Sequence, residues 1–290
     1  MKRKLSIILI SLIFLSGLGI MLYPMISNAY MEYKQNSIIK NYDEVVKEMP
    51  KDTINEELEH ARDYNKLLIG TAIVTDPFDP EAQKKLEQSS NYFNILNLDK
   101  KGLIGHIVIP KINVNLPIYH GTSEEVLQKG VGHLQNTSFP VGGESTHSVL
   151  SGHTGLSSAK LFTDLDKLEE GNIFYIKTLG ETFAYEVDQI KIVEPHETSD
   201  LLIESGKDYV TLVTCTPYGI NSHRLLVRGT RIPYTEEVKE EIAKEEKENI
   251  GSTWRDEYFK ALAVGLSGLT ILVIIFVIVL LVKKKGRKKE

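Results

Sequence analysis

Two uncharged apolar runs, residues 5–26 and 261–282, limit how this chain can fold. A helix needs about 20 apolar residues to cross a bilayer, and each run is long enough. Lysine and arginine gather on the outer flanks, as MKRK before the first run and KKKGRKK after the second. Because positive flanks stay on the cytoplasmic side, both termini are expected in the cytoplasm and the middle of the chain outside.

The first run also has the features of a signal peptide, because the small residues SNA at 27–29 resemble a cleavage site. Residues 1–28 are therefore expected to be a membrane anchor or a cleaved signal peptide. The second run has no comparable soluble interpretation. Residues 261–282 are expected to be a transmembrane helix, and residues 283–290 a basic cytoplasmic tail.

The residues between the two apolar runs, which are expected to be exported, change in amino-acid pattern along the chain. Residues 29–69 have helical spacing and few glycines or prolines, whereas GTAIVTDPFDP predicts a loop that we assign to 70–82. Short β-branched segments with glycine-rich turns then follow. They predict a mainly β fold, a closed or nearly closed barrel over 83–235 in which 157–171 is the clearest helix. Residues 236–260 are strongly charged and predict a spacer leading to the membrane.

Composition excludes several classes of function. The net charge of −5 argues against nucleic acid as the main partner. The sequence contains no metal-binding pattern, no P-loop, no dinucleotide fingerprint and no G-x-S-x-G nucleophile elbow. No cofactor or metal is implied. The chain has a single cysteine, so it cannot form an intramolecular disulfide.

That cysteine, Cys215, ends the apolar strand YVTLVTC, and Arg224 lies near the start of the following strand, HRLLVRG. If the two strands pair as neighbours, the turn brings the two side chains together, and a guanidinium favours a thiolate or an oxyanion. A buried structural cysteine and a surface arginine explain the same spacing. A nucleophilic cysteine also needs an acid or base partner. His153, in SGHTG at the end of a strand, is well placed among the histidines at 60, 106, 120, 133, 147, 153, 196 and 223.

Taken together, TLVTC, the arginine nine residues later and the upstream SGHTG resemble the signature of the sortase family. The resemblance extends over most of the exported part. It implies a sortase-type eight-stranded β-barrel with short helices, an N-terminal helical region and a lid, flanked by transmembrane helices. The TDPFDP segment before the barrel and the C-terminal apolar run resemble class C, the sortases of Gram-positive bacteria that assemble pili.

The resemblance implies roles for particular residues. Cys215 is the expected nucleophile, His153 its acid/base partner, and Arg224 the residue that positions substrate and stabilises the oxyanion. In the lid, Asp76 is expected to pair with Arg224, and Phe78, which follows Pro77, to cover Cys215. The expected reaction cleaves an LPXTG-like sorting signal between Thr and Gly and transfers the acyl group to a pilin lysine.

Two other functions remain open from the sequence. One keeps the chemistry and attaches proteins to the peptidoglycan precursor, although the lid motif and the second apolar run weigh against it. The other is a membrane-tethered binding protein whose cysteine is only structural. The expected partners of the leading interpretation are pilin subunits that carry a sorting signal and an acceptor lysine, together with the membrane.

Overall fold

The structure is a computed structural model that describes residues 2–70, 74–86, 91–98, 100–156, 158–240, 259–260, 262–268 and 270. The chain divides into two compact units, 1–249 and 250–290. In the second unit the described residues are helical. Most of the expected spacer at 236–260 and of the expected transmembrane helix at 261–282, and all of the basic tail at 283–290, lie outside the described residues.

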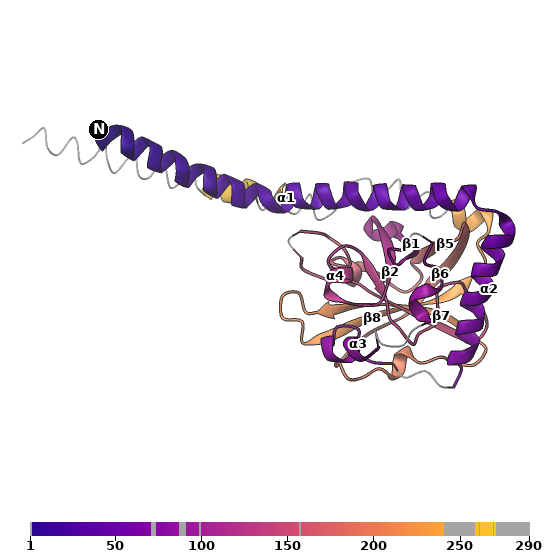
Figure 1. Ribbon diagram of the computed structural model, residues 1–290. Helices are drawn as coiled ribbons and strands as arrows, with labels where there is room; N and C mark the ends of the chain where they lie inside the picture. Colours follow the sequence, from indigo (N-terminus) through magenta and orange to yellow (C-terminus); the bar gives the residue numbers. More distant parts are fainter. Residues whose placement is uncertain are drawn as a thin grey trace, which may run out of the picture. The chain divides into compact units, whose positions relative to one another are not determined.

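Eight strands of the first unit close into a barrel in the order β1-β2-β3-β4-β7-β8-β6-β5 (Figure 1). Neighbouring strands are antiparallel, except that β2 and β3, and β4 and β7, are parallel. The expected mainly β, eight-stranded barrel is confirmed. The strands are β1 Leu103–Ile109, β2 Val114–His120, β3 Val131–His133, β4 Thr146–Ser151, β5 Ile173–Thr178, β6 Glu181–Val193, β7 Asp208–Thr216 and β8 His223–Ile232.

Strand β7 is buried on both of its faces. Val210 and Leu212 belong to the main core, and Val213, which points the opposite way, belongs to a second apolar cluster. Burying one large aliphatic side chain contributes about 1.5–3 kcal/mol, so this second cluster favours a cover that keeps water away from it. We call it the outer cluster; its buried members are Leu134, Val149, Leu201, Val213 and Leu226.

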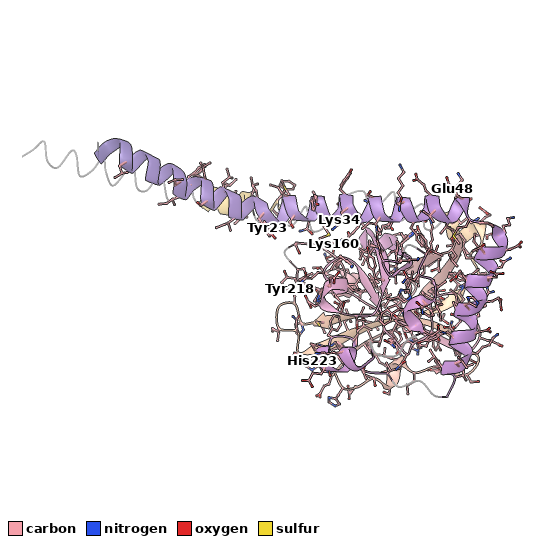
Figure 2. The ribbon with its side chains drawn as sticks, viewed as in Figure 1. Tyr23, Lys34, Glu48, Lys160, Tyr218 and His223 are labelled. Atoms are coloured by element: carbon pink, nitrogen blue, oxygen red, sulfur yellow. The ribbon has the colours of Figure 1, made fainter. Side chains whose placement is uncertain are left out.

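Helix α1, Lys2–Glu48, is continuous from the first apolar run into the exported part. It therefore crosses the expected boundary at residue 28 without a break. Its second half packs on the barrel, where Tyr42 donates from its hydroxyl to Ile104 O at 2.8 Å and accepts from Leu179 N at 2.9 Å. Tyr23, Lys34 and Glu48 mark its course in Figure 2. Among the described residues, Leu12–Glu48 is a helix long and apolar enough to cross a membrane.

Helix α2, Lys51–Leu68, leads directly into the expected lid and fixes where that segment begins. Its Asn65 is buried and exchanges two hydrogen bonds with the backbone of Phe139, at 3.0 and 2.7 Å. Figure 1 shows α2 along the side of the barrel. Within the expected lid at 70–82, residues 74–79 are described as turns and irregular structure, and α3, Pro80–Leu86, begins before the expected boundary at residue 82.

The prediction of a helix over 157–171 is wrong. Over 158–171 the structure has turns and one short 3₁₀ helix, η3 Leu165–Lys167. Leu161 has a φ of 43°, which lies outside the helical region, and Phe162 is fully buried. Phe162 therefore enters the core from a turn, whereas the spacing of apolar residues had predicted that it would lie on a helix. The other 3₁₀ helices are η1 Tyr92–Asn94, η2 Pro110–Ile112 and η4 Ser199–Leu201, and the short α-helix α4 is Glu124–Leu127.

Candidate active site

The pairing of β7 with β8 brings Cys215 and Arg224 together. The two strands are antiparallel, and in their register Cys215 is directly opposite Arg224. Directly opposed residues on an antiparallel pair have Cβ atoms about 4.5–5.5 Å apart. The spacing in the sequence therefore predicted their neighbourhood correctly. Tyr218, in the connecting loop, and His223, the first residue of β8, mark this end of the hairpin in Figure 2.

His153 reaches the same edge of the barrel because β4 and β7 run parallel. Their register places Ser151 opposite Val213, so the residues that follow β4 and those that follow Val213 lie at the same end of the barrel. Gly152 N donates to Val213 O at 3.1 Å, and Thr214 Oγ1 donates to Gly152 O at 2.7 Å. These bonds tie the residue before His153 to the two residues before Cys215.

The backbone around His153 leaves no room for a side chain at Gly152. A Cβ there would lie 2.8 Å from the ring of Phe162. Phe162 N also donates to His153 O at 3.0 Å, which fixes the chain on the far side of the histidine. The glycine before the histidine in SGHTG thus has a structural cause, since it lets the core ring of Phe162 pack directly against the backbone there.

Asp76 of the expected lid binds Arg224 through two parallel hydrogen bonds. Arg224 Nε donates to Asp76 Oδ1 at 2.9 Å, and Nη2 donates to Oδ2 at 2.6 Å. The side chain of Arg224 is 11% exposed and that of Asp76 is 13% exposed. A two-pronged pair of this kind is stronger and more directional than a single bond.

Phe78 contacts two of the three expected catalytic side chains, Arg224 and His153. Its ring centroid is 5.1 Å from Cζ of Arg224 and 5.7 Å from the ring centroid of His153. Phe78 and Val74 also pack against the outer cluster. The segment that contains Asp76, Pro77 and Phe78 therefore covers both the polar site and the apolar surface beside it.

Burial, Arg224 and Asp76 all affect the ionisation of Cys215. Burial raises the pKa of the thiol, Asp76 raises it further, and Arg224 opposes both by lowering it. The net pKa is above the ordinary value, so this arrangement favours the neutral thiol. Burial disfavours the charged guanidinium of Arg224, but the hydrogen bonds and charge of Asp76 outweigh it, and the pKa of Arg224 is raised.

Four other histidines are buried away from this site. His120 faces the carbonyls of Gly102 and Ile95, His133 contacts Tyr92 and Ser138 O, and His147 lies between Leu202 O and Thr211 Oγ1. Burial lowers the pKa of His133 to about 3 and that of His147 and His106 to about 4. His223, on β8, is opposite Thr216 and not Cys215.

One neighbour of His153 was not found by sequence reasoning. Glu124, the first residue of α4, has its Oε2 atom 3.4 Å from Nε2 of His153. Nothing in the local pattern of TSEEVLQ signals this contact, because it depends on how the connection between β2 and β3 folds back to the end of β4. Among the described residues, no group of three or more His, Cys, Asp or Glu side chains is arranged to hold a metal ion.

Known structures share this arrangement of strands and helices. A crystal structure of sortase C1 from Streptococcus agalactiae is 50% identical, covers 70% of this chain and 98% of its own, and has a TM-score of 0.63. The chain belongs to the sortase family. The sortase C structure from Streptococcus pneumoniae is 47% identical, over 69% of this sortase and 98% of that chain, with a TM-score of 0.62. The expectation of a class C sortase, and with it of a sortase-type cysteine transpeptidase, is confirmed.

More distant relatives match a smaller part of this sortase. The family model described as the sortase domain matches residues 107–232. Sortase D of Bacillus subtilis is 34% identical over 131 residues, which are 44% of this chain and 63% of that protein. Sortase A of Bacillus anthracis is 31% identical over 133 residues, 46% and 61% of the two chains. The match thus spans less than two thirds of the length of these curated relatives.

Proposed function

We propose that this sortase is a pilin polymerase. It cleaves an LPXTG-like sorting signal between Thr and Gly through a thioacyl intermediate on Cys215, and it transfers the acyl group to a lysine of a second pilin. The observation that carries the proposal is the convergence of Cys215, Arg224 and His153 at one edge of the barrel beneath Asp76 and Phe78. The S. pneumoniae sortase C among its solved neighbours has pilin substrates.

The first half of the reaction forms the thioester. The thiolate of Cys215 attacks the threonine carbonyl carbon, and the carbonyl oxygen becomes an oxyanion beside the guanidinium of Arg224. The C–N bond then breaks, and the imidazolium of His153 gives its proton to the leaving glycine amine. The products are the thioacyl-enzyme, a neutral His153 and the released C-terminal peptide.

The lid sets the order of events. While Asp76 holds Arg224 and Phe78 lies between Arg224 and His153, a sorting signal has no access to the guanidinium or to the outer cluster. The lid must therefore move before the first step, as gating loops do in other enzymes. Its departure also removes the charge of Asp76 and reduces burial, the two influences that raise the pKa of Cys215. Substrate entry and thiol activation are thereby coupled.

The proposed location is the outer face of a Gram-positive cell membrane. Helix α1 carries the apolar run and continues into the part that packs on the barrel, which supports a catalytic domain anchored close to the bilayer. Both termini are assigned to the cytoplasm from the positive flanks. The single cysteine offers a direct test, since a membrane-impermeant thiol reagent on intact cells should label the lid variant Asp76→Asn at Cys215. Labelling that appears only after lysis contradicts the assignment.

The deciding experiment identifies the bond that the purified full-length chain makes. Candidate pilins are incubated with the wild type and with Cys215→Ala, and the products are analysed by tandem mass spectrometry. A threonine-to-lysine isopeptide that is absent with Cys215→Ala is expected. Acylation of a peptidoglycan-precursor amine alone would assign the anchoring function instead. Equal products with both proteins would leave Cys215 only a structural role.

A further inference from the structure

Glu124 presents a carboxylate to His153 from helix α4. The helix begins at Glu124, with Ser123 Oγ accepting a hydrogen bond from Val126 N at its start. Glu124 Oε2 lies 3.4 Å from His153 Nε2, and Oε1 accepts a hydrogen bond from Gln128 Nε2 at 2.9 Å. Gln128, one turn along, therefore holds the carboxylate in its orientation. The side chain of Glu124 is 67% exposed, so a group from outside can reach it.

The ring nitrogen opposite this carboxylate lacks a hydrogen bond. Among the described residues, Nε2 of His153 has no hydrogen-bond partner although it is buried. A buried polar atom without a partner is costly by about 1–3 kcal/mol. The closed lid contributes to this burial, because Phe78 packs against the same ring. A ligand that donates hydrogen bonds to both Nε2 and the carboxylate would satisfy the histidine once the lid has moved.

We propose that Glu124 and Nε2 of His153 form the binding site for the acceptor lysine. Its ammonium carries a positive charge and three N–H groups, so it can donate to the carboxylate and to the ring together. This site rests on the proposed function and adds the residue that receives the second substrate. Glu124 is then a catalytic residue of the second half-reaction, and Gln128 is a positioning residue that acts through Glu124.

The chemistry of the second half-reaction requires such a site. A free lysine side chain has a pKa of about 10.4, so it arrives protonated and cannot attack. The first half-reaction leaves His153 neutral, so Nε2 accepts one proton from the ammonium held by Glu124. The free amine attacks the thioester carbon, the C–N bond forms, and the C–S bond breaks with its electron pair on Sγ of Cys215. The sulfur takes the second amine proton, and the imidazolium releases its proton to solvent.

The site also explains how an amine can be selected over water. Water carries no charge, so Glu124 gives it no electrostatic advantage, whereas an ammonium is concentrated beside the thioester. The carboxylate of Glu124 belongs to α4 and not to the lid. The lysine that accepts the acyl group would therefore bind to a different element of the fold from the one that controls entry of the sorting signal. Glu124 is therefore expected to contribute more to aminolysis than to the formation of the thioester.

The test separates the two half-reactions in the full-length chain in detergent, with and without Asp76→Asn to release the lid. A sorting-signal peptide is added alone, and the thioacyl-enzyme is followed by intact-mass spectrometry. The peptide is then combined with increasing concentrations of Nα-acetyl-lysine amide. For Glu124→Gln we expect a KM for the lysine amine raised about tenfold, the effect of losing one charge-assisted hydrogen bond, and a smaller change in the acylation rate.

Two matched controls isolate the charge of Glu124. Glu125→Gln makes the same change one residue along α4, where the carboxylate pairs with Lys129 at 3.3 Å, and it should leave the KM unchanged. Hydroxylamine, which is uncharged at neutral pH, should resolve the thioester of Glu124→Gln as fast as that of the wild type. Glu124→Ala, at an exposed position, serves as the second variant, and the Tm of each variant is measured beside the kinetics.

The outcomes distinguish this inference from the proposed function. Normal acylation with an unchanged lysine KM in Glu124→Gln and Glu124→Ala overturns the acceptor site and leaves the transpeptidase intact. An equal slowing of acylation and of aminolysis also overturns it, because Glu124 would then act through His153 in both steps. If even the lid-released chain forms no thioacyl-enzyme, the proposed function falls and the acceptor site falls with it.

Discussion

Asp76 and Arg224 are joined by two parallel hydrogen bonds, from Nε to Oδ1 at 2.9 Å and from Nη2 to Oδ2 at 2.6 Å. The carboxylate of Asp76 therefore occupies two N–H donors of the guanidinium that, in the proposed reaction, binds the substrate. In the proposed reaction, Arg224 binds Asp76 while the lid is closed and stabilises the oxyanion once the lid has moved. A lid that competes for a catalytic group, and does not merely stand in front of it, links closure to inactivity.

Release of the lid should expose the thiol. Asp76→Asn removes the charge from the pair with Arg224, and we expect a maleimide to label Cys215 about tenfold faster than in the wild type. Because the chain has a single cysteine, the mass added reports on that residue alone. Glu81→Gln, an exposed carboxylate in the first turn of α3, is the control and should label at the wild-type rate. An unchanged rate in Asp76→Asn contradicts the lid.

The pH dependence of the same labelling should move in a defined direction. Burial and Asp76 both raise the pKa of Cys215 and so disfavour the reactive thiolate at neutral pH. Asp76→Asn removes one of these influences, and Phe78→Ala reduces the other by uncovering the site. The midpoint of the rate against pH should therefore fall in both variants. A midpoint that stays in place or rises shows that the lid does not control the ionisation of Cys215.

Arg224 should matter most for the acylation step. Arg224→Ala removes the oxyanion donor and should slow acylation by about 10²–10³-fold. Arg224→Lys keeps the charge but loses the two-pronged geometry, so it should recover only part of the rate. Arg228→Lys, four residues along β8 and paired with Asp188, is the control and should acylate normally. Acylation at the wild-type rate in Arg224→Ala excludes the assigned role.

Acid should destabilise the fold through its buried histidines. His147 lies between Leu202 O and Thr211 Oγ1, and burial lowers its pKa to about 4. The unfolded chain takes up this proton near pH 6.5, so the stability contributed by the neutral ring is complete above that pH and is lost as the pH falls toward about 4. The Tm should drop over this range.

A variant assigns part of that drop to His147. His147→Gln can still donate to the carbonyl and accept from the hydroxyl, and it cannot become charged, so its Tm should depend less steeply on pH. His196→Gln changes a residue whose side chain is 77% exposed and should keep the wild-type slope. Equal slopes in all three proteins indicate that other groups cause the acid sensitivity.

Much of this protein could be predicted from its sequence because the decisive signals are local. The apolar run of α1 is long and uninterrupted, and alternation along YVTLVTC and HRLLVRG predicted two strands whose pairing places Cys215 opposite Arg224. A short connection between antiparallel strands leaves little choice of partner. The order of SGHTG, TLVTC and the arginine then carried the family resemblance, and with it the fold.

Tertiary structure decided the features that join distant segments. The parallel pairing of β4 and β7 brings His153 to the edge of the barrel where Cys215 lies, and Phe78, which packs on the outer cluster, contacts His153 and Arg224 there. Leu161 leaves the helical region so that Phe162 can enter the core, which helical periodicity alone could not foresee. The approach of Glu124 to His153 likewise depends on the path of a whole connection. Local patterns specify elements, whereas contacts between those elements depend on how the entire core packs.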